Sequence, residues 1–466
     1  MPALIGGDLE VPLATGGRRR YVNLDAAAST PAMRAVLDAV ERALPWYSSV
    51  HRGAGFTSQV STRLYEAARQ TVADFVDARS SDTVVFVRNT TDAINHLAAG
   101  LRLPDGHVVL STAVEHHANM LPWRRLAPVV TLPPPPSREA LLDNVAAALR
   151  DPERPVGVLA ITGASNVTGE VMPLAELARL AHEHGALLAV DAAQLAPHRR
   201  IDMAATGIDC LSISGHKMYA PFGAGALVAP SALLAECEPL LAGGGAVDFV
   251  TLDDVLWTAL PDRLEAGSPN VIGAVALAAA AATLADVGME RVADHERELL
   301  AHAEGRLAEL PGLVRHRLWE GPEVDRVGVL TITVPGIHHA LVAAALSAEH
   351  AIGVRHGCFC AHPYITHLLG ISEDEALVIR DALRRGERAA VPGAVRASFS
   401  IATTLADVDA FCDALASLVH DGPALAYEQD AATGDFLPRG DGRTLPRIEP
   451  LPELTAVVHG AGCGQF

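Results

Sequence analysis

Lys217 is the only lysine of the chain, which otherwise carries its basic charge on arginines. An arginine stays protonated at neutral pH, whereas the amine of a lysine can be tuned to lose its proton. A neutral amine is the nucleophile that attacks a carbonyl carbon to form a Schiff base. A general preference for arginine leaves this exception unexplained, although chance retention of one lysine stays open. We therefore predict that Lys217 acts as an amine nucleophile toward an aldehyde.

Two polar side chains directly before Lys217 suit the same site. Ser214 and His216 follow a short apolar segment, in a stretch rich in glycine and proline that is typical of a loop at a sheet edge. Each side chain can donate a hydrogen bond to a phosphate. A phosphorylated aldehyde is therefore a suitable ligand for this segment.

Asp191 lies at the end of another apolar segment, residues 186–191. An unpaired carboxylate is costly in such a place. A protonated pyridine ring would be a suitable partner, because the carboxylate keeps the ring an electron sink. Gln194 can reach a phenolate oxygen of the same ring. These features predict pyridoxal 5'-phosphate (PLP), while a helix-capping role for Asp191 stays open.

Two more strand ends carry residues that can bind a cofactor. Thr90 and Thr91 join the predicted strand 83–87 to a helix, and a helix N-terminus favours an anion. His116 follows the predicted strand 107–111, and its imidazole could stack on a ring or move protons. The alternatives are an ordinary threonine cap and a solvated loop histidine.

Short apolar segments alternate with amphipathic helical stretches over the first two thirds of the chain. This alternation predicts an α/β fold with a mainly parallel sheet covered on both faces. The remainder suits a smaller α+β domain. The predicted division is an N-terminal segment, a large PLP-binding domain, a small C-terminal domain and a Pro/Gly-rich tail, over residues 1–20, 21–285, 286–420 and 421–466.

Composition limits the possible partners and compartment. The net charge of −19 disfavours nucleic acid and anionic membranes. The segment Val271–Ala285 is too short and too rich in alanine to span a bilayer, so we expect a buried helix. The six cysteines do not form a disulfide framework, and Cys358 and Cys360 alone do not complete a metal site. We expect a cytoplasmic protein without a metal.

In this order, the strings resemble the cysteine desulfurases and selenocysteine lyases of the class V aminotransferase fold, in the group with a short active-site loop. The resemblance covers roughly residues 21–419 and implies the PLP-dependent transferase fold of type I. It rests on at least eight strings in register, which include 23–31, 50–53, 90–91, 115–117, 165–169, 191–194, 214–217, 265–270 and 396–398.

The resemblance implies a role for each matching residue. Lys217 would be the Schiff-base lysine, and His116 would stack on the cofactor ring and help proton transfer. Asn166, Arg396 and Arg355 would bind the substrate. The residues implied in cofactor binding are Thr90, Thr91, His116, Asp191, Gln194, Ser214, His216 and Lys217, with Ser268 supplied across a homodimer interface.

Cys360 matches the reactive cysteine of the family loop, five positions after Arg355 and directly before Ala-x-Pro. The nearby arginine and histidines could favour its thiolate. Cys358 and Phe359 stand where the short-loop group usually has two histidines. Cys358 is then either a small buried apolar residue or a second thiol that relays sulfur.

The resemblance implies a desulfurase that takes sulfur from L-cysteine as a Cys360 persulfide, leaves alanine, and passes the sulfur on, with a sulfur-acceptor protein as a possible partner. A related C–S lyase, selenocysteine lyase or epimerase acting on a modified amino acid stays open, as does a lapsed sulfur-carrier scaffold. The C-terminal tail either drapes over the fold or is disordered, and Cys463 within it is a surface thiol or a sulfur acceptor.

Overall fold

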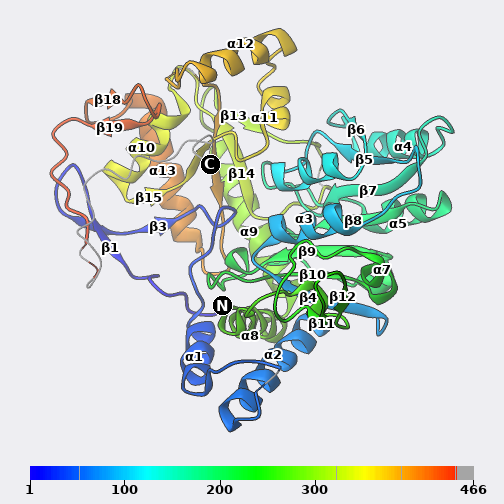
Figure 1. Cartoon of the computed structure of the whole chain (residues 1–466). Coiled ribbons are helices and arrows are strands. Elements are labelled where there is room, and N and C mark those ends of the chain that lie inside the picture. The colour runs from blue at the N-terminus through cyan, green and yellow to red at the C-terminus, as the bar shows by residue number, and fades with distance from the viewer. Residues whose placement is uncertain (52, 322, 390, 447, 449–466) are drawn as a thin grey trace.

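A seven-stranded sheet forms the centre of the chain, whose computed structural model describes residues 1–51, 53–321, 323–389, 391–446 and 448 (Figure 1). Every neighbouring pair of its strands is parallel except those made by β10, which runs antiparallel to β4 and β9. The predicted mainly parallel sheet is therefore confirmed. In spatial order its strands are β4 (Asp82–Val87), β10 (Gly225–Pro230), β9 (Cys210–Ser214), β8 (Leu187–Asp191), β7 (Val156–Thr162), β5 (Val108–Thr112) and β6 (Val129–Leu132).

Helices cover both faces of this sheet because successive side chains of its strands point to opposite sides. In β7, Leu159 and Ile161 pack into the larger core cluster, whereas Val158 and Ala160 pack into another. The second cluster takes in α3 (Thr90–Gly100) and α7 (Ser231–Glu236). The larger cluster takes in α1 (Arg34–Ala43), α2 (Phe56–Phe75), α4 (Arg138–Leu149), α5 (Leu174–Glu183), α6 (Met203–Thr206) and α8 (Val271–Val287).

The alanine-rich segment predicted as a buried helix is α8, most of whose residues are buried. No single helix in the described part of the chain is both long and apolar enough to cross a membrane. Only α8 taken together with α9 (Met289–Leu307) meets that test, and the pair is bent by 77°.

A second sheet lies beside the first, in the order β13 (Val314–His316), β14 (Val329–Thr333), β17 (Ala394–Ser398) and β16 (Arg355–Gly357). Its core includes residues of α9, α10 (His339–His350) and α13 (Leu405–Asp421). Strand β3 (Val22–Asn23), near the N-terminus, pairs with β15 (Ile352–Gly353). The N-terminal part of the chain therefore packs on this smaller unit. The hairpin β1 (Glu10–Pro12) and β2 (Arg18–Arg20) precedes it, and α11 (His362–Leu368) and α12 (Glu373–Arg384) lie between β16 and β17.

The C-terminal segment drapes over the fold as far as it is described, which was one of the two sequence expectations. Its strands β18 (Tyr427–Gln429) and β19 (Phe436–Pro438) form an antiparallel hairpin that packs against α10. The sequence showed no period there because each strand has only three residues. Cys463, and Arg52 of one matched string, lie outside the described residues.

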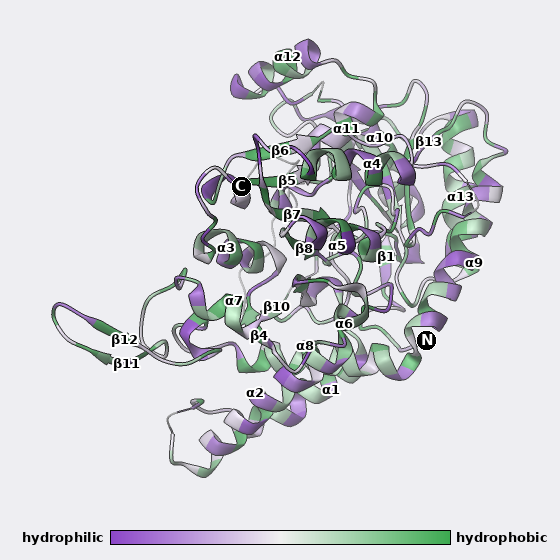
Figure 2. Cartoon of the chain, turned by 90° about the vertical axis from the view of Figure 1, so that its right-hand side faces the viewer, coloured by the Kyte–Doolittle hydropathy of each residue, from purple (hydrophilic) through white to green (hydrophobic). Residues whose placement is uncertain are grey.

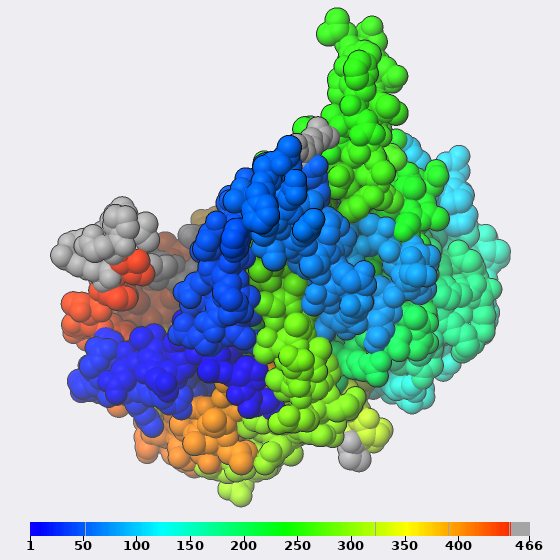
Figure 3. Space-filling view, turned by 90° about the horizontal axis from the view of Figure 1, so that it is seen from below, coloured from blue at the N-terminus to red at the C-terminus, as the bar shows by residue number. Residues whose placement is uncertain are grey.

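A hairpin of β11 (Val247–Val250) and β12 (Val255–Trp257) projects from the body of the molecule (Figures 2 and 3). It carries an unusual share of exposed apolar side chains, which are Phe249, Val250, Leu252, Val255 and Leu256. The sequence analysis did not predict these strands.

Candidate active site

The carboxyl ends of β5, β7, β8 and β9 open into a cavity of about 470 Å³ between the two sheets. Ligands in open α/β folds bind at such ends, because the loops that follow the strands meet there. Lys217 enters this cavity from the turn Gly215–Lys217 that follows β9. The cavity also contains each of the other predicted site residues except Ser268, namely Thr90, Thr91, His116, Asn166, Asp191, Gln194, Ser214, His216, Arg355, Cys360 and Arg396.

Burial lowers the pKa of Lys217 to about 8; the charge of Asp191 opposes this shift and that of Arg396 adds to it. The amine is therefore partly neutral near physiological pH, as a nucleophile must be. Burial also raises the pKa of Asp191, although the N–H of Ala193 donates to its Oδ1 at 3.0 Å. A cationic ring nitrogen beside Asp191 would offset the cost of burying this carboxylate.

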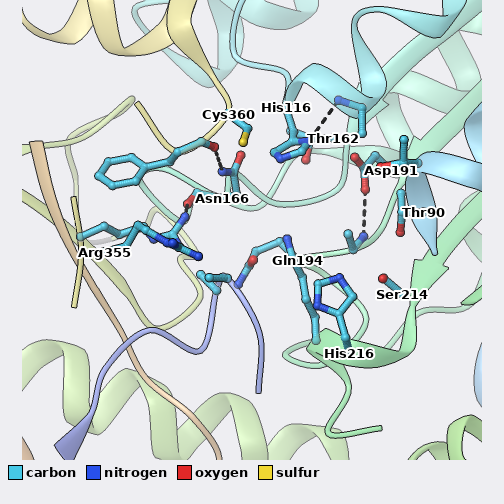
Figure 4. Close-up of a pocket in the computed structure, with 18 of the residues that line it drawn as sticks. Thr90, His116, Thr162, Asn166, Asp191, Gln194, Ser214, His216, Arg355 and Cys360 are labelled. Atoms are coloured by element: carbon cyan, nitrogen blue, oxygen red, sulfur yellow. Dashed lines mark hydrogen bonds between the residues drawn. The ribbon is translucent and has the colours of Figure 1, made fainter. Parts of the chain in front are cut away.

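Polar atoms without partners gather at the end of the cavity near Asp191 (Figure 4). Ten side-chain atoms in the described residues are buried without a hydrogen-bond partner, and five belong to residues that line this cavity. Thr90 Oγ1 and Ser214 Oγ are two of the five, and Thr90 is the first residue of α3. Burial and the charge of Lys217 lower the pKa of His216 to about 4, so its imidazole is neutral. Two hydroxyls, a helix N-terminus and an imidazole suit a phosphate.

Gln194 connects the cavity to a buried charged cluster. Its Nε2 lies 3.1 Å from Nε2 of His198, whose Nδ1 in turn contacts Glu296. Gln194 Oε1 has no partner. Because His198 Nδ1 donates to the Glu296 carboxylate, the neutral ring accepts at Nε2, and the Gln194 amide donates to it.

Two arginines at the other end of the cavity share one carboxylate. Asp25 Oδ1 accepts from Arg396 Nη2 at 3.3 Å, and Asp25 Oδ2 lies 3.4 Å from Arg355 Nε. Arg396 Nη1 donates to the carbonyl of Asn166 at 2.8 Å, and Arg396 Nε has no partner. Burial lowers the pKa of Arg396 to about 10, which leaves it cationic at neutral pH. The spare donor suits a substrate carboxylate.

The loop that carries Cys360 is held from several sides. Phe359 and Cys360 have positive φ values of 53° and 55°, a strained conformation for residues with side chains. Asn166 Nδ2 donates to the carbonyl of Phe359 at 2.8 Å, and the Arg396 guanidinium lies 4.9 Å from the Phe359 ring centre. The N–H of His117 donates to the carbonyl of Cys360 at 2.8 Å. Cys360 therefore lines the cavity, whereas Cys358 is 3% exposed and belongs to the large core.

His116 is fixed by the turn that follows it. Its Nδ1 accepts from the N–H of Ala118 at 3.1 Å, so the neutral ring carries its proton on Nε2. The preceding Glu115 is fully buried and accepts from Thr112 Oγ1 at 2.9 Å and Asn119 Nδ2 at 2.7 Å. Burial raises the pKa of Glu115 to about 8. This anchor holds the loop that presents His116.

A family model for class V aminotransferases matches residues 22–411. The chain belongs to the class V aminotransferases, in the cysteine desulfurase family. It is 35% identical to a probable cysteine desulfurase of Halalkalibacterium halodurans over 403 residues, which cover 84% of this chain and 92% of that protein. It is 36% identical to a cysteine desulfurase of Escherichia coli over 354 residues, 74% of this chain and 85% of the relative.

Solved structures of the same family have the same fold. The cysteine desulfurase CsdA from Escherichia coli, in an S-sulfonic acid form, has a TM-score of 0.71 and 34% identity over 85% of this chain and 94% of its own. The apo cysteine desulfurase of Thermococcus onnurineus has a TM-score of 0.76 and 30% identity over 90% of this chain and 99% of its own. Like its family, this chain is a PLP-dependent enzyme.

The residues of the cavity fit PLP. Lys217 offers an amine of lowered pKa to the aldehyde, and Asp191 faces the same cavity as a buried acceptor for the ring nitrogen. Thr90 and Ser214 have unpartnered hydroxyls that a phosphate would satisfy. Buried polar atoms without hydrogen bonds destabilise the fold, and a single bound PLP would give these atoms their partners.

Ser268 is the one predicted site residue outside the cavity. It lines a separate hollow with His51, Glu265 and residues of the loop 47–50. The proposed role of Ser268 in a partner subunit stays a prediction.

Two carboxylates of the site were missed by the sequence analysis. Asp25 lies within the matched string 23–31, and this match was the available sequence signal for it. Asp435 lines the cavity from the C-terminal hairpin, and nothing in the local sequence marks it.

We predict that Arg396→Lys raises KM for L-cysteine by roughly ten- to a hundredfold, because one ammonium cannot replace a planar, two-donor guanidinium. Steady-state kinetics would separate this effect from any change in kcat. Arg102→Lys, a change at an exposed arginine outside the cavity, is the control. An unchanged KM in Arg396→Lys would contradict the assigned carboxylate site.

Proposed function

We propose that this enzyme removes sulfur from L-cysteine to give alanine and a persulfide on Cys360. The observation that carries the proposal is the shared cavity of Cys360, Lys217 and Arg396, which brings a thiol, a tunable amine and a carboxylate receptor together. The relatives named as cysteine desulfurases support the same reaction.

The substrate binds at the end of the cavity that is lined by Arg355 and Arg396. Arg396 offers its unpartnered Nε to the substrate carboxylate, and Arg355 adds a second cation beside it. One N–H of Asn166 Nδ2 is used by Phe359, so the second remains for the carboxylate. Fixing this end orients the substrate sulfur relative to Cys360.

Bound PLP supplies an electron sink that makes the substrate Cα–H acidic. Lys217 would hold the cofactor through its amine, and this amine, once the substrate amine takes its place, would accept the Cα proton. Asp191 would stabilise positive charge on the ring nitrogen. General acid–base catalysis of this kind contributes on the order of 10²- to 10⁴-fold in rate.

The Cys360 thiolate then attacks the substrate sulfur. The new S–S bond takes the sulfur to Cys360, and the electrons of the broken C–S bond stay on the carbon skeleton, which becomes alanine after protonation. His116, with its proton on Nε2, is the proposed donor.

A homodimer would complete the proposed site. The exposed apolar hairpin β11–β12 is the kind of surface that a protein partner covers. Ser268 lies outside its own chain's cavity, which suits a contribution to the cavity of the second subunit.

None of the five described cysteines is in a disulfide, which suits the cytoplasm. A sulfur acceptor, either a protein thiol or a small thiol, would take the persulfide sulfur from Cys360. Turnover requires this second thiol.

The direct test is product balance. Purified enzyme with L-cysteine and a reducing thiol is expected to release sulfide and alanine in equal amounts, measured by colorimetry and by mass spectrometry. Equal amounts of pyruvate and ammonia without alanine would instead indicate a C–S lyase, and the desulfurase assignment would then be wrong.

A further inference from the structure

Asp435 brings a carboxylate into the active-site cavity from outside the family domain. It lies directly before β19, whereas the family match ends at residue 411. Its side chain is 14% exposed, with Oδ1 3.4 Å from His356 Nε2. Oδ2 is buried and has no hydrogen-bond partner. A buried carboxylate oxygen without a donor is costly, so the position calls for a ligand.

The hairpin that carries Asp435 is firmly anchored. Glu349 of α10 is 7% exposed and accepts from Ala424 N at 2.9 Å, Leu425 N at 3.2 Å and Tyr427 Oη at 2.8 Å. Gly434 has a φ of 81°, and a Cβ there would lie 2.7 Å from the carbonyl oxygen of Arg388. The chain is therefore held close to the smaller unit at the residue before Asp435.

A histidine pair settles what the other carboxylate oxygen meets. His339 Nε2 lies 2.9 Å from the carbonyl of Val391, so that nitrogen donates. Burial lowers the pKa of His339 to about 4, so the ring is neutral and its Nδ1 accepts from His356 Nδ1 at 3.3 Å. His356 Nε2 faces Asp435 Oδ1 at 3.4 Å. Oδ2 of the same carboxylate is left without a donor.

The rest of the cavity wall explains which ligand fits Oδ2. Arg355 and Arg396 are cationic groups that suit the anionic parts of the cofactor and substrate. An ionised carboxylate among them attracts a cation and repels an extra anion. The desulfurase reaction uses thiols twice, once as the substrate and once as the acceptor of sulfur from Cys360.

Because the substrate amine is needed to replace Lys217 on the cofactor, we propose that Asp435 binds the ammonium group of a small aminothiol that accepts sulfur from Cys360. That the ligand carries a thiol rests on the proposed function, because the desulfurase reaction needs a sulfur acceptor. The thiolate of the acceptor attacks the outer sulfur of the Cys360 persulfide. The S–S bond to Cys360 breaks, Cys360 leaves as a thiolate, and the acceptor becomes a persulfide. This exchange needs no further oxidant or reductant.

The first test measures charge selection without turnover. Cys360 of the holoenzyme would be labelled with 2-aminoethyl and with 2-sulfonatoethyl methanethiosulfonate at low salt, and labelling at Cys360 followed by peptide mass spectrometry. The ratio of the cationic to the anionic rate is expected to fall on the order of fivefold in Asp435→Asn. Glu428→Gln removes the same charge from an exposed position of the same hairpin and should leave the ratio unchanged. An unchanged ratio in folded Asp435→Asn would overturn the proposal.

A second measurement tests the acceptor directly. Asp435→Asn is expected to slow sulfur transfer from Cys360 to cysteamine selectively, relative to transfer to 2-mercaptoethanol. An equal effect on both thiols would overturn the aminothiol assignment.

Failure of this proposal is separable from failure of the proposed function. The labelling ratio needs no desulfurase activity, so an enzyme inactive on cysteine could still show charge selection at Asp435. If Asp435→Asn does not fold, as judged by circular dichroism and Tm, the smaller Asp435→Ser is measured in the same way.

Discussion

Lys217→Arg is expected to lose the visible absorbance of covalently bound PLP and at least about 10³-fold in activity on L-cysteine. The substitution keeps a positive charge in the cavity but removes the amine that attacks the aldehyde. Lys217→Ala should lose both properties as well, which separates the lack of the amine from the larger volume of arginine. Absorption spectra after addition of PLP and removal of the excess would measure the bound cofactor.

The wild-type enzyme supplies a further check on Lys217. Because burial lowers its pKa to about 8, the neutral fraction of the amine rises with pH. The rate at which apoenzyme attaches PLP should therefore rise about tenfold from pH 7 to pH 9 and level off above that. A lysine of ordinary pKa would instead give a rise of about a hundredfold that continues beyond pH 9. A Lys217→Arg protein that keeps the visible absorbance would contradict the assignment.

Cys360→Ala is expected to keep the bound-cofactor absorbance of the wild type while losing roughly 10²-fold or more of its sulfide release from L-cysteine. The reason is that the substrate sulfur then has no thiolate to receive it. Mass spectrometry of wild-type enzyme after a single turnover should find one extra sulfur atom on the peptide that contains Cys360. The variant should show none there.

Cys358→Ala is the matched control, since Cys358 lies two residues away and is buried in the large core. It should retain its activity with some loss of stability, on the order of 1 kcal/mol, from the small cavity left by the sulfur. A strong loss of sulfur transfer in Cys358→Ala would favour a relay through the second thiol. Full activity of Cys360→Ala would exclude the persulfide mechanism and favour direct lyase chemistry.

The arginine cluster shows how the site depends on segments far apart in the chain. Asp25 follows β3, Arg355 begins β16 and Arg396 lies in β17. Register in the second sheet brings the two arginines opposite each other, and the bridge from Asp25 to Ser398 adds the carboxylate. One acidic residue thus sets the position of two cations that would hold the substrate.

Much of the fold follows from local sequence patterns. The strands that contain Leu110 and Asp191 were predicted because runs of apolar residues form buried parallel strands. Edge strand β6 was missed, since its residues are mostly half-buried and leave a weaker pattern. The hairpin β18–β19 was missed because a strand of three residues is too short to repeat the two-residue alternation that marks a strand in a sequence.

The sequence by itself determined the chemistry of the enzyme. A lone lysine, an aspartate at a strand end and a cysteine in a matching loop are statements about residue type and local spacing, and these suffice to predict a PLP site. They work because the carboxyl ends of neighbouring parallel strands meet at one edge of the sheet.

Only the tertiary structure decided that Cys358 is buried in the core and that Asp435 lines the cavity. Cys358 and Cys360 differ by two positions, and the left-handed turn at Phe359 and Cys360 separates core from cavity. Asp435 reaches the site because Glu349 anchors a hairpin from the far end of the chain. Such contacts join residues distant in sequence, so they leave no local periodicity to read, and they exist only once both sheets have packed.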